Sequence, residues 1–454
     1  MAEPTAPTAP TLSRSLGLWQ CIGIVVGTII GTGVFLKTAG MAHQAGSVAW
    51  VLIAWGVAGA LSTTGALTYA ELGGMFPEAG GEYVYLREAY GRYAGYLYGW
   101  TRFWVGSPGS IAAYAVGSAT FLSGALPVAS LGGPKVVAVA LIAIFATISC
   151  LRVRVGGNLQ VVLTGLKVAL ILGLAVAAFI LPPSQGLSNL ASSPTSAFPG
   201  LSIFGLLVLS ALWAYDGWNN LPMAAGEVAN PQRNLPRSLI LGSLSVLAIY
   251  AAINVAYFYA MPFAEVASSA SDFNKNAPPI AGKVAATLLG PLAGGAIAFA
   301  MTVSALSAMH GSILTGARVP FALARDGLAP RGLSSLNRAA VPARAVIVLC
   351  IVAAVLSVAG TFDQLTNSVV FASWIFYAMN AGSVILLRIR RPDLARPYRV
   401  PGFPVVPLLF TGLSGLLLVN TVVSSPSNAL LGLGLMALSL PAYLLTEHLR
   451  RRRS

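Results

Sequence analysis

Two stretches combine glycine with polar side chains inside otherwise apolar sequence, and their residues are the best placed to bind a small molecule. The first reads GIVVGTIIGTGVF, from Gly23 to Phe35, and the second reads LSALWAYDGWNNLP, from Leu209 to Pro222. Glycine, aspartate and asparagine are poor residues for the interior of a helix in lipid, where exposed backbone is tolerated only beside a cavity. We therefore expect a helix break in each stretch. The N–H groups freed at a break attract a carboxylate, and the freed carbonyl groups attract an ammonium.

A site that offers both kinds of group at a fixed spacing suits a zwitterionic amino acid. The spacing of Gly23, Gly27 and Gly31 has another explanation, which is the close packing of two helices. A nucleotide-binding loop is disfavoured for Gly31 to Gly33, because neither a third glycine at the required spacing nor a preceding strand is present. For Asp216, the alternative to a binding role is a structural carboxylate bonded to nearby backbone. A charge at this depth costs about 2.5–3.5 kcal/mol, so a partner or a function has to offset it.

Lys167 is the other ionisable residue deep in an apolar run, GNLQVVLTGLKVALILGL. It lies about ten residues into that run, or roughly 15 Å deep, which is too far for easy snorkelling. We expect its ammonium to reach the free carbonyl groups of a broken helix, where it would replace a coupling cation and could exchange a proton. The alternative is a buried ion pair with Asp216 or another carboxylate.

Two further titratable side chains lie within apolar runs. Arg102 follows Arg92 by ten residues, and we expect it to sit at the cytoplasmic edge of its span with its guanidinium reaching water. For His310, a neutral histidine that packs between helices is favoured over a role in binding substrate or moving protons.

The elements that must hold these residues are membrane helices. The chain has 454 residues, of which 56% are hydrophobic and only 9% are charged, whereas soluble domains carry about 25% charged residues. This composition excludes a soluble enzyme, a disordered protein and a coiled coil. Three cysteines, all within apolar runs, give neither a disulfide framework nor the spacing of a metal site.

Apolar runs of membrane length recur along the chain and predict twelve spans. The expected spans are 17–38, 47–70, 94–122, 134–151, 157–181, 201–223, 237–261, 284–316, 345–360, 366–387, 403–423 and 427–446. The fold class is therefore an all-α integral membrane protein. Residues 1–15 are expected to form a disordered tail. The apolar run that comes after them is expected to be an uncleaved first helix rather than a signal peptide.

The basic residues indicate the orientation of these spans. With both termini in the cytoplasm, almost all Lys and Arg of the loops face the cytoplasm, and only Lys37, Lys135, Lys275 and Lys283 lie outside. The basic residues behind the net charge of +14 then set the orientation of the spans and contact anionic lipid, rather than bind nucleic acid. We expect a multi-pass protein of the plasma membrane, which is the inner membrane in a bacterium.

The two expected breaks fall at corresponding depths of spans that run in opposite directions. Such a pair points to inverted repeats with a substrate site at the bilayer midplane. We therefore expect a ten-helix core over residues 16–400, with repeats at about 16–182 and 201–390. Residues 401–446 would form helices 11 and 12, and residues 447–454 a basic cytoplasmic tail.

Several motifs, taken together, resemble the amino acid/polyamine/organocation superfamily, and within it the L-type amino acid transporter family. Besides the first glycine stretch they are FPEAGGEYVYLREAYG, ARDGLAP and LWAYDGWNNLPMAAGEVANPQRNLPRS. The resemblance implies a leucine-transporter-like fold with a five-plus-five inverted repeat and broken helices 1 and 6.

The resemblance also implies where an amino acid binds. Its carboxylate would lie at the turn formed by Gly31, Thr32 and Gly33, and its amino group at the carbonyls of Ile29 and Trp213. Trp213 would also close over the substrate as an aromatic gate. Lys167 matches a lysine that stands where sodium-coupled relatives bind sodium, which implies sodium independence.

Asp216 makes the second stretch most similar to the subgroup that exchanges basic and neutral amino acids. A carboxylate there could pair with a cationic side chain or help to hold the α-amino group, and Asn219 is a further candidate for the site. Animal members bond a glycoprotein through a cysteine between the third and fourth helices, but residues 123–135 contain none, so no disulfide-linked partner is expected.

We therefore predict a sodium-independent exchanger of neutral or basic L-amino acids that works by alternating access and uses no cofactor. A proton-coupled symporter of the same fold is the main alternative. A membrane-embedded enzyme is disfavoured, because the sequence has neither a zinc-binding HExxH pair nor paired aspartates on facing spans.

Overall fold

The computed structural model describes residues 12–123, 126–181, 186–270, 278–290, 293–359, 362–424 and 426–451. Most of the expected N-terminal tail, Lys275 and the last three residues of the basic C-terminal tail lie outside these ranges. The described residues form helices and turns, with one isolated β-bridge between Leu16 and Val228.

The helices follow the apolar runs closely. Those in the first part of the chain are α1 (Leu18–Ile29), α2 (Gly33–Ala45), α3 (Val48–Met75), α4 (Glu82–Tyr90), α5 (Arg92–Thr101), the π-helical turn η1 (Arg102–Gly106), α6 (Ser107–Leu122), η2 (Val128–Leu131), α7 (Pro134–Ser149), α8 (Val153–Ile180) and α9 (Leu187–Leu190). Those in the second part are α10 (Leu201–Ala214), α11 (Asn220–Met223), η3 (Ala225–Glu227), α12 (Pro231–Ala260), α13 (Phe263–Ala267), α14 (Ile280–Leu289), α15 (Ala293–Gly316), α16 (Arg318–Arg325), η4 (Arg331–Ser334), α17 (Ala343–Ala359), α18 (Phe362–Arg390), α19 (Val405–Ser424), α20 (Pro426–Ala437) and α21 (Ser439–Arg451).

Five helical segments of the described chain are long and apolar enough to cross a membrane. They are Leu18–Ala45, Val48–Met75, Val153–Ile180, Pro231–Ala260 and Ala293–Arg325. Five shorter apolar helices accompany them, at Pro134–Ser149, Leu201–Ala214, Ile280–Leu289, Ala343–Ala359 and Val405–Asn420. An all-helical membrane protein is thus confirmed as the fold class.

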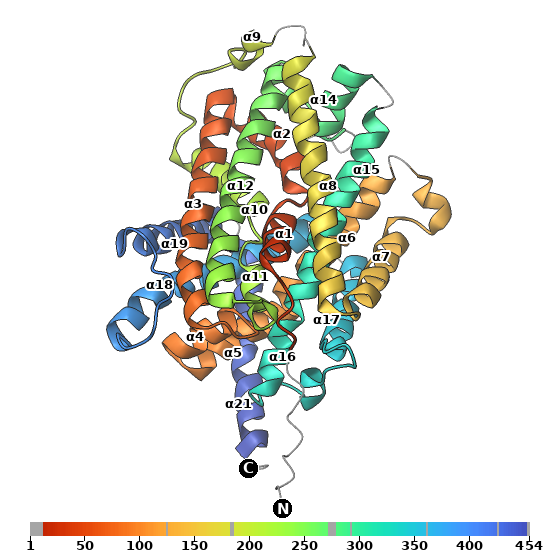
Figure 1. Ribbon diagram of the computed structural model, residues 1–454. Coiled ribbons are helices and arrows are strands. Elements are labelled where there is room, and N and C mark those ends of the chain that lie inside the picture. The colour runs from red at the N-terminus through yellow and green to blue at the C-terminus, as the bar shows by residue number, and fades with distance from the viewer. Residues whose placement is uncertain are drawn as a thin grey trace, which may run out of the picture.

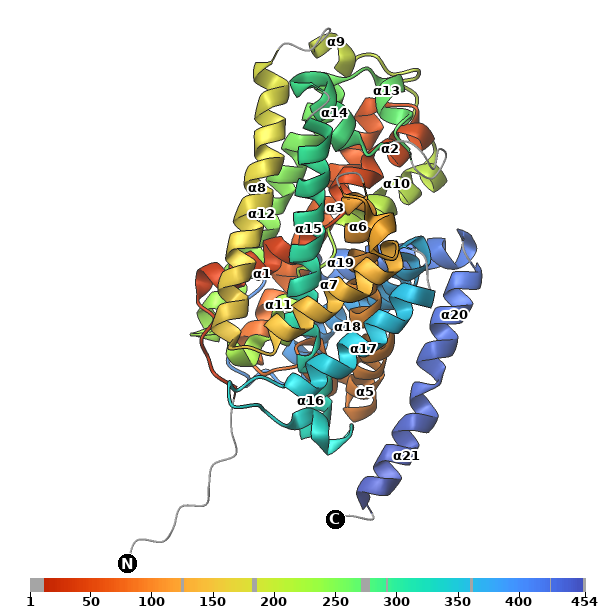
Figure 2. The ribbon, with the colours of Figure 1, turned by 90° about the vertical axis from the view of Figure 1, so that its right-hand side faces the viewer.

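The long helices run side by side along the body of the molecule. α12 packs against both α3 and α8, and α15 packs against α6 and α8 (Figures 1 and 2). α20 and α21 lie along one side, and the described part of the chain begins and ends toward the same end of the molecule (Figure 2).

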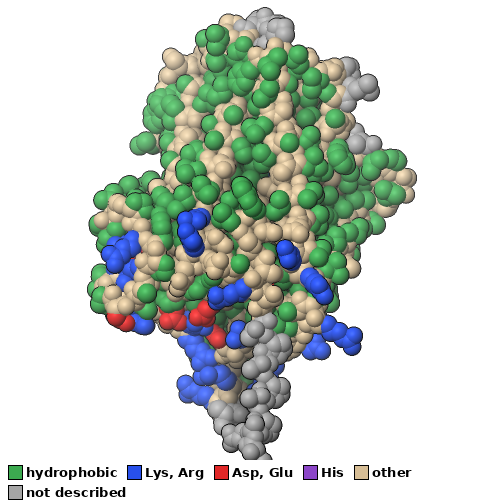
Figure 3. Space-filling view, in the orientation of Figure 1, with side chains coloured by type: hydrophobic (Ala, Val, Ile, Leu, Met, Phe, Trp, Pro, Cys, Tyr) green, Lys and Arg blue, Asp and Glu red, His purple; other side chains and the backbone are tan. Residues whose placement is uncertain are grey.

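The outer surface of the helices is apolar, as contact with lipid requires. Large hydrophobic side chains stand exposed on several helices, including Val162, Ile180, Leu201 and Leu416. On the face shown in Figure 3, hydrophobic side chains cover most of the body, and Lys and Arg gather toward the end that carries the chain termini. A soluble protein rarely exposes so large an apolar area, so we assign this surface to the bilayer.

Backbone pairing ties the start of α1 to the segment after α11. The N–H of Leu16 donates to the carbonyl of Glu227 at 2.9 Å, and the N–H of Ala229 donates to the carbonyl of Leu16 at 2.8 Å. These bonds form the Leu16–Val228 bridge and hold together two parts of the chain that are distant in sequence.

The same region contains a buried ion pair between Glu227, at the end of η3, and Arg318, at the start of α16. Two parallel bonds of 2.9 and 2.8 Å join the guanidinium to the carboxylate, and the two side chains are 1% and 0% exposed. Bidentate geometry of this kind fixes orientation as well as distance.

We predict that Arg318→Ala lowers stability by about 3–5 kcal/mol, because it leaves the Glu227 carboxylate buried without its cation. The measurement is the unfolding midpoint in detergent, with Arg331→Ala, which truncates an exposed arginine, as the matched control. Replacing both partners, in Glu227→Gln/Arg318→Met, should recover part of the loss. Equal midpoints for Arg318→Ala and the control would contradict the prediction.

Candidate functional site

Both glycine-containing stretches interrupt a helix where the sequence predicts it. Between α1 and α2, the backbone of Ile30, Gly31 and Thr32 leaves the helical path, and between α10 and α11 the residues from Tyr215 to Asn219 form turns. Close packing of helices nevertheless accounts for Gly23 and Gly27, which lie in α1 against α8: a Cβ on them would lie 3.2 Å from Val161 and 2.0 Å from Gln160.

The two breaks face each other. The Thr28 hydroxyl, whose shortest bond of 2.7 Å goes to the Ile24 carbonyl, lies 2.9 Å from the Gly217 carbonyl oxygen. Gly217 has a φ of +122°, and a Cβ built there would lie only 2.7 Å from the carbonyl oxygen of Thr28. Only glycine allows this backbone conformation and this close approach, so Gly217 brings the two breaks into contact.

The turn before α2 presents groups suited to a carboxylate. The first N–H groups of a helix have no partner within it, and α2 begins at Gly33 inside the protein. The hydroxyl of Thr32 is buried and has no hydrogen-bond partner among the described residues. A Cβ on Gly33 would lie 3.0 Å from the Trp213 ring, so the aromatic side chain lies against this turn. The ammonium of Lys37 makes a cation–π contact with Trp213, and its nitrogen lies 5.3 Å from the ring centroid.

The carbonyl groups freed by the breaks accept bonds from neighbouring helices. The Tyr250 hydroxyl lies 3.2 Å from the Ile29 carbonyl and 2.9 Å from that of Ala214. The Ser304 hydroxyl lies 3.2 Å from the Ile30 carbonyl and 3.0 Å from that of Gly31. A carbonyl oxygen has two lone pairs, and the Ile29 oxygen already accepts a second bond from the N–H of Gly31 at 2.8 Å. An ammonium at this carbonyl would therefore replace the longer bond from Tyr250.

Lys167 lies where its burial depth suggested. It is 1% exposed, and its ammonium donates to the carbonyls of Gly27 at 2.7 Å, Ile30 at 2.5 Å and Ser304 at 3.2 Å. Gly27 lies in the last turn of α1, Ile30 in the first break and Ser304 in α15. Three carbonyl oxygens around one positive charge resemble the coordination of a monovalent cation, and the bonds go to the backbone rather than to Asp216 as an ion pair would require.

Asp216 lies in the second break and is partly buried. Its carboxylate accepts a short hydrogen bond from the hydroxyl of Tyr377 in α18. The bond uses one carboxylate oxygen, so the side chain keeps further acceptor capacity for a cationic group.

Glu82 is a buried carboxylate that sequence reasoning missed. It begins α4 and is 0% exposed. It accepts bonds from the Tyr69 hydroxyl at 3.0 Å, from the Asn380 amide at 2.9 Å and from the Asn219 amide at 2.6 Å. Asn219, expected to contact substrate, is thus committed to Glu82 through its amide nitrogen. The only sequence signal was the position of Glu82 within the motif FPEAGGEYVY, since hydropathy places that motif in a loop.

The expectation that Arg102 reaches water at the edge of its span is wrong. Arg102 is 6% exposed, and its guanidinium donates to the side-chain oxygen of Asn220 at 2.5 Å. It starts the π-helical turn η1, and such turns are frequent at functional sites. Together with Glu82, Asn219 and Tyr377, it lines a cavity of about 10 Å³ beside the second break.

His310 packs between helices, as predicted. Its Nε2 lies 3.1 Å from the Gly156 carbonyl, and its Nδ1 lies 3.4 Å from the Ser149 hydroxyl. A carbonyl can only accept, so Nε2 carries the hydrogen, and the Ser149 hydroxyl can donate to Nδ1. A neutral ring satisfies both bonds.

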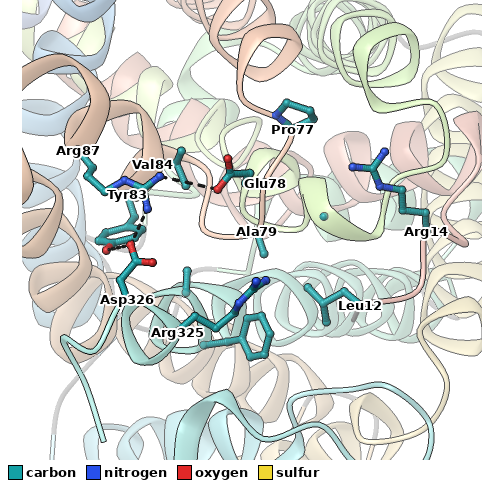
Figure 4. Close-up of a pocket in the computed structure, with 13 residues that line it drawn as sticks. Leu12, Arg14, Pro77, Glu78, Ala79, Tyr83, Val84, Arg87, Arg325 and Asp326 are labelled. Atoms are coloured by element: carbon teal, nitrogen blue, oxygen red, sulfur yellow. Dashed lines mark hydrogen bonds and ion pairs between the residues drawn. The ribbon is translucent and has the colours of Figure 1, made fainter. Parts of the chain in front are cut away.

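A larger pocket of about 550 Å³ opens between α4, α16 and the residues that precede α1. Figure 4 shows Arg87 reaching Glu78 and Asp326, at distances of 3.8 and 2.5 Å. Burial and the hydrogen bond to Asp326 raise the pKa of the Tyr83 hydroxyl, which therefore stays protonated and donates to that carboxylate. None of the residues predicted to bind substrate lines this pocket, so it is separate from the helix breaks.

Two interrupted helices that meet inside an apolar helical body are typical of a membrane transport protein. The chain belongs to the amino acid permease family, whose model matches residues 16–439. It is 33% identical over 431 residues to the human "b(0,+)-type amino acid transporter 1", covering 93% of this chain and 85% of the relative. It is 31% identical over 450 residues to the rat "Large neutral amino acids transporter small subunit 2", covering 96% of this chain and 81% of the relative. The predicted superfamily, the L-type transporter family and the assignment to amino acid transport are confirmed.

Proposed function

We propose that the protein is a sodium-independent exchanger of neutral or basic L-amino acids that uses alternating access. The observation that carries the proposal is the ammonium of Lys167 on three backbone carbonyls at the first break. A permanently attached cation at that place removes the need for a sodium ion to hold the break together. The names of the two relatives, which state amino acid transport, support the substrate class.

In the proposed binding mode, the substrate lies between the two breaks. Its carboxylate contacts Thr32 and the first N–H groups of α2, and its ammonium contacts the carbonyls of Ile29 and Trp213. The buried Thr32 hydroxyl without a partner supports the first part of this mode, because such a group is costly unless a ligand satisfies it. Asp216 is assigned to the side chain of the substrate.

The proposed architecture has twelve membrane helices, with two five-helix repeats of opposite orientation at about 16–182 and 201–390. Helices 11 and 12, over residues 401–446, flank this core. The gathering of Lys and Arg at the end with both termini (Figure 3) supports a cytoplasmic location for those termini in the plasma membrane. We further propose that the protein works without a disulfide-linked partner, since residues 123–135 contain no cysteine.

The test is uptake of labelled amino acid into proteoliposomes that contain purified protein. We expect uptake to rise at least tenfold when the vesicles are preloaded with unlabelled amino acid, and to stay unchanged when choline replaces sodium. Vesicles without protein are the control. Uptake into empty vesicles that follows an imposed proton gradient would instead show a symporter, and a strict requirement for sodium would contradict the role assigned to Lys167.

A further inference from the structure

Three charged side chains converge beside the second break, although they come from distant parts of the sequence. Glu82 lies at the start of α4, Arg102 in η1 and Asp216 in the break itself. Glu82 and Arg102 line the same small cavity as Tyr377, which donates its hydroxyl to Asp216. Both carboxylates lie within electrostatic reach of the Arg102 guanidinium.

The hydrogen bonds around these groups suit two ionised carboxylates and one guanidinium, which is the charge state that the inference assumes. Glu82 accepts three bonds on its two oxygens, which is the pattern of an ionised carboxylate. Asp216 accepts one bond from Tyr377 and is taken as ionised as well, and an arginine keeps its charge under all ordinary conditions. The three side chains therefore sum to one negative charge.

Arg102 does not neutralise either carboxylate by direct pairing. Its guanidinium is bonded to the Asn220 amide oxygen, and its Nε has no partner among the described residues. Asn219 likewise has an amide oxygen without a partner on the same cavity. A cavity of about 10 Å³ has room for roughly one water molecule. Asp216 thus remains able to pair with a substrate, while Arg102 weakens the negative potential around it.

We propose that the sum of the charges on Glu82, Asp216 and Arg102, rather than Asp216 alone, sets the preference for the charge of the substrate side chain. Glu82 and Arg102 are then specificity-determining residues that act through the field at the site. The positive charge of a cationic substrate side chain would neutralise the single negative charge of these three residues. The inference rests on the proposed amino acid transport and identifies the substrate class that this site favours.

The expected size of the effect follows from Coulomb's law. At a separation of about 8 Å and an effective dielectric constant of about 20, one unit charge changes the affinity for a cationic group by roughly 30-fold. Local water reduces this effect, so we expect about a tenfold change for each charge removed.

The experiment compares kcat/KM for arginine and leucine in proteoliposomes and reports their ratio. Glu82→Gln should lower the arginine-to-leucine ratio about tenfold, and Arg102→Gln should raise it about tenfold. The double variant Glu82→Gln/Arg102→Gln has the wild-type sum of charges and should return to within about threefold of the wild-type ratio. A purely structural role would not produce opposite shifts that cancel.

The substitution at Glu82 suits the surrounding hydrogen bonds. Asn219 and Asn380 each bond Glu82 through nitrogen while their amide oxygens have no partner among the described residues. Turning the Asn219 amide over would present its oxygen to the new glutamine amide, whereas the Asn380 nitrogen also donates to the Phe376 carbonyl at 2.8 Å and stays in place. The variant is therefore expected to fold, which monodisperse elution in detergent would verify.

Arg154→Gln removes a positive charge from an exposed position and should leave the ratio unchanged. An unchanged ratio in both single variants, or a double variant that remains about tenfold from wild type, would overturn the inference. If Arg102→Gln does not fold, Glu82→Gln decides the matter alone: a tenfold fall supports the inference and an unchanged ratio overturns it. Failure of the proposed function is a separate result, because wild-type protein would then transport neither amino acid.

Discussion

Replacing Lys167 with alanine is expected to abolish amino acid exchange, with a loss of at least about 100-fold in rate. The substitution removes the donor that the carbonyls of Gly27, Ile30 and Ser304 share. The Ile30 carbonyl keeps the Ser304 hydroxyl and Ser304 lies within α15, so the cost of about 1–3 kcal/mol for an unpaired group falls on Gly27. The first break then lacks the cation that holds its two ends, so the proposed site for the substrate carboxylate should lose its geometry. Exchange in preloaded proteoliposomes measures the loss.

Two controls separate the positive charge of Lys167 from its bulk. Lys167→Met keeps most of the side-chain volume and should be as inactive as Lys167→Ala. Lys135→Met removes an exposed lysine that also donates to a carbonyl, that of Val358 at 2.7 Å, and should retain exchange. Both Lys167 variants are expected to insert and to elute as monodisperse protein. Normal exchange kinetics in Lys167→Ala would show that the ammonium is not a substitute for a coupling cation.

Replacing Asp216 with glycine is expected to weaken basic substrates far more than neutral ones. The carboxylate is assigned to the substrate side chain, where a charge-assisted bond is about twice as strong as a neutral one. We expect the apparent affinity for arginine to fall by about 100-fold and that for leucine by less than about fivefold. Competition of each unlabelled amino acid against labelled substrate gives both numbers from one preparation.

The matched variant is Tyr377→Phe, which removes the hydroxyl bonded to Asp216 and leaves the carboxylate in place. It should preserve the preference for basic substrates, because the charge is unchanged. Asp216→Asn should behave like Asp216→Gly. An equal loss for arginine and leucine in Asp216→Gly would instead assign Asp216 to the α-amino group of the substrate or to the fold.

The helix breaks and the environment of Lys167 could be predicted because lipid leaves few solutions for polar groups at depth. Glycines around Gly31 and the polar run beginning at Asp216 cannot remain in regular helix without cost. A lone ammonium at the level of Lys167 must find acceptors inside the protein, and a broken helix is a ready source of them. In both cases one local physical constraint determined the result.

Glu82 and Arg102 could not be placed in the same way, because their positions depend on contacts between distant segments. Hydropathy assigns the start of α4 to a loop, yet Tyr69 and two asparagines enclose the Glu82 carboxylate. Counting residues from Arg92 put Arg102 near the membrane edge, whereas the π-helical turn and the Asn220 amide keep it inside. The hydropathy of a single span does not show which residues of other segments will contact it.

The backbone pairing of Leu16 with Val228 has a mechanical consequence for transport. Because α1 and the segment after α11 share main-chain bonds at one end and the Thr28–Gly217 contact at the other, the inner halves of both broken helices form a single lever. In the proposed alternating access, these two segments would therefore move together as one rigid unit. The hinge for that motion then lies at the unwound residues themselves, so substrate contacts and hinge torsions change in the same step.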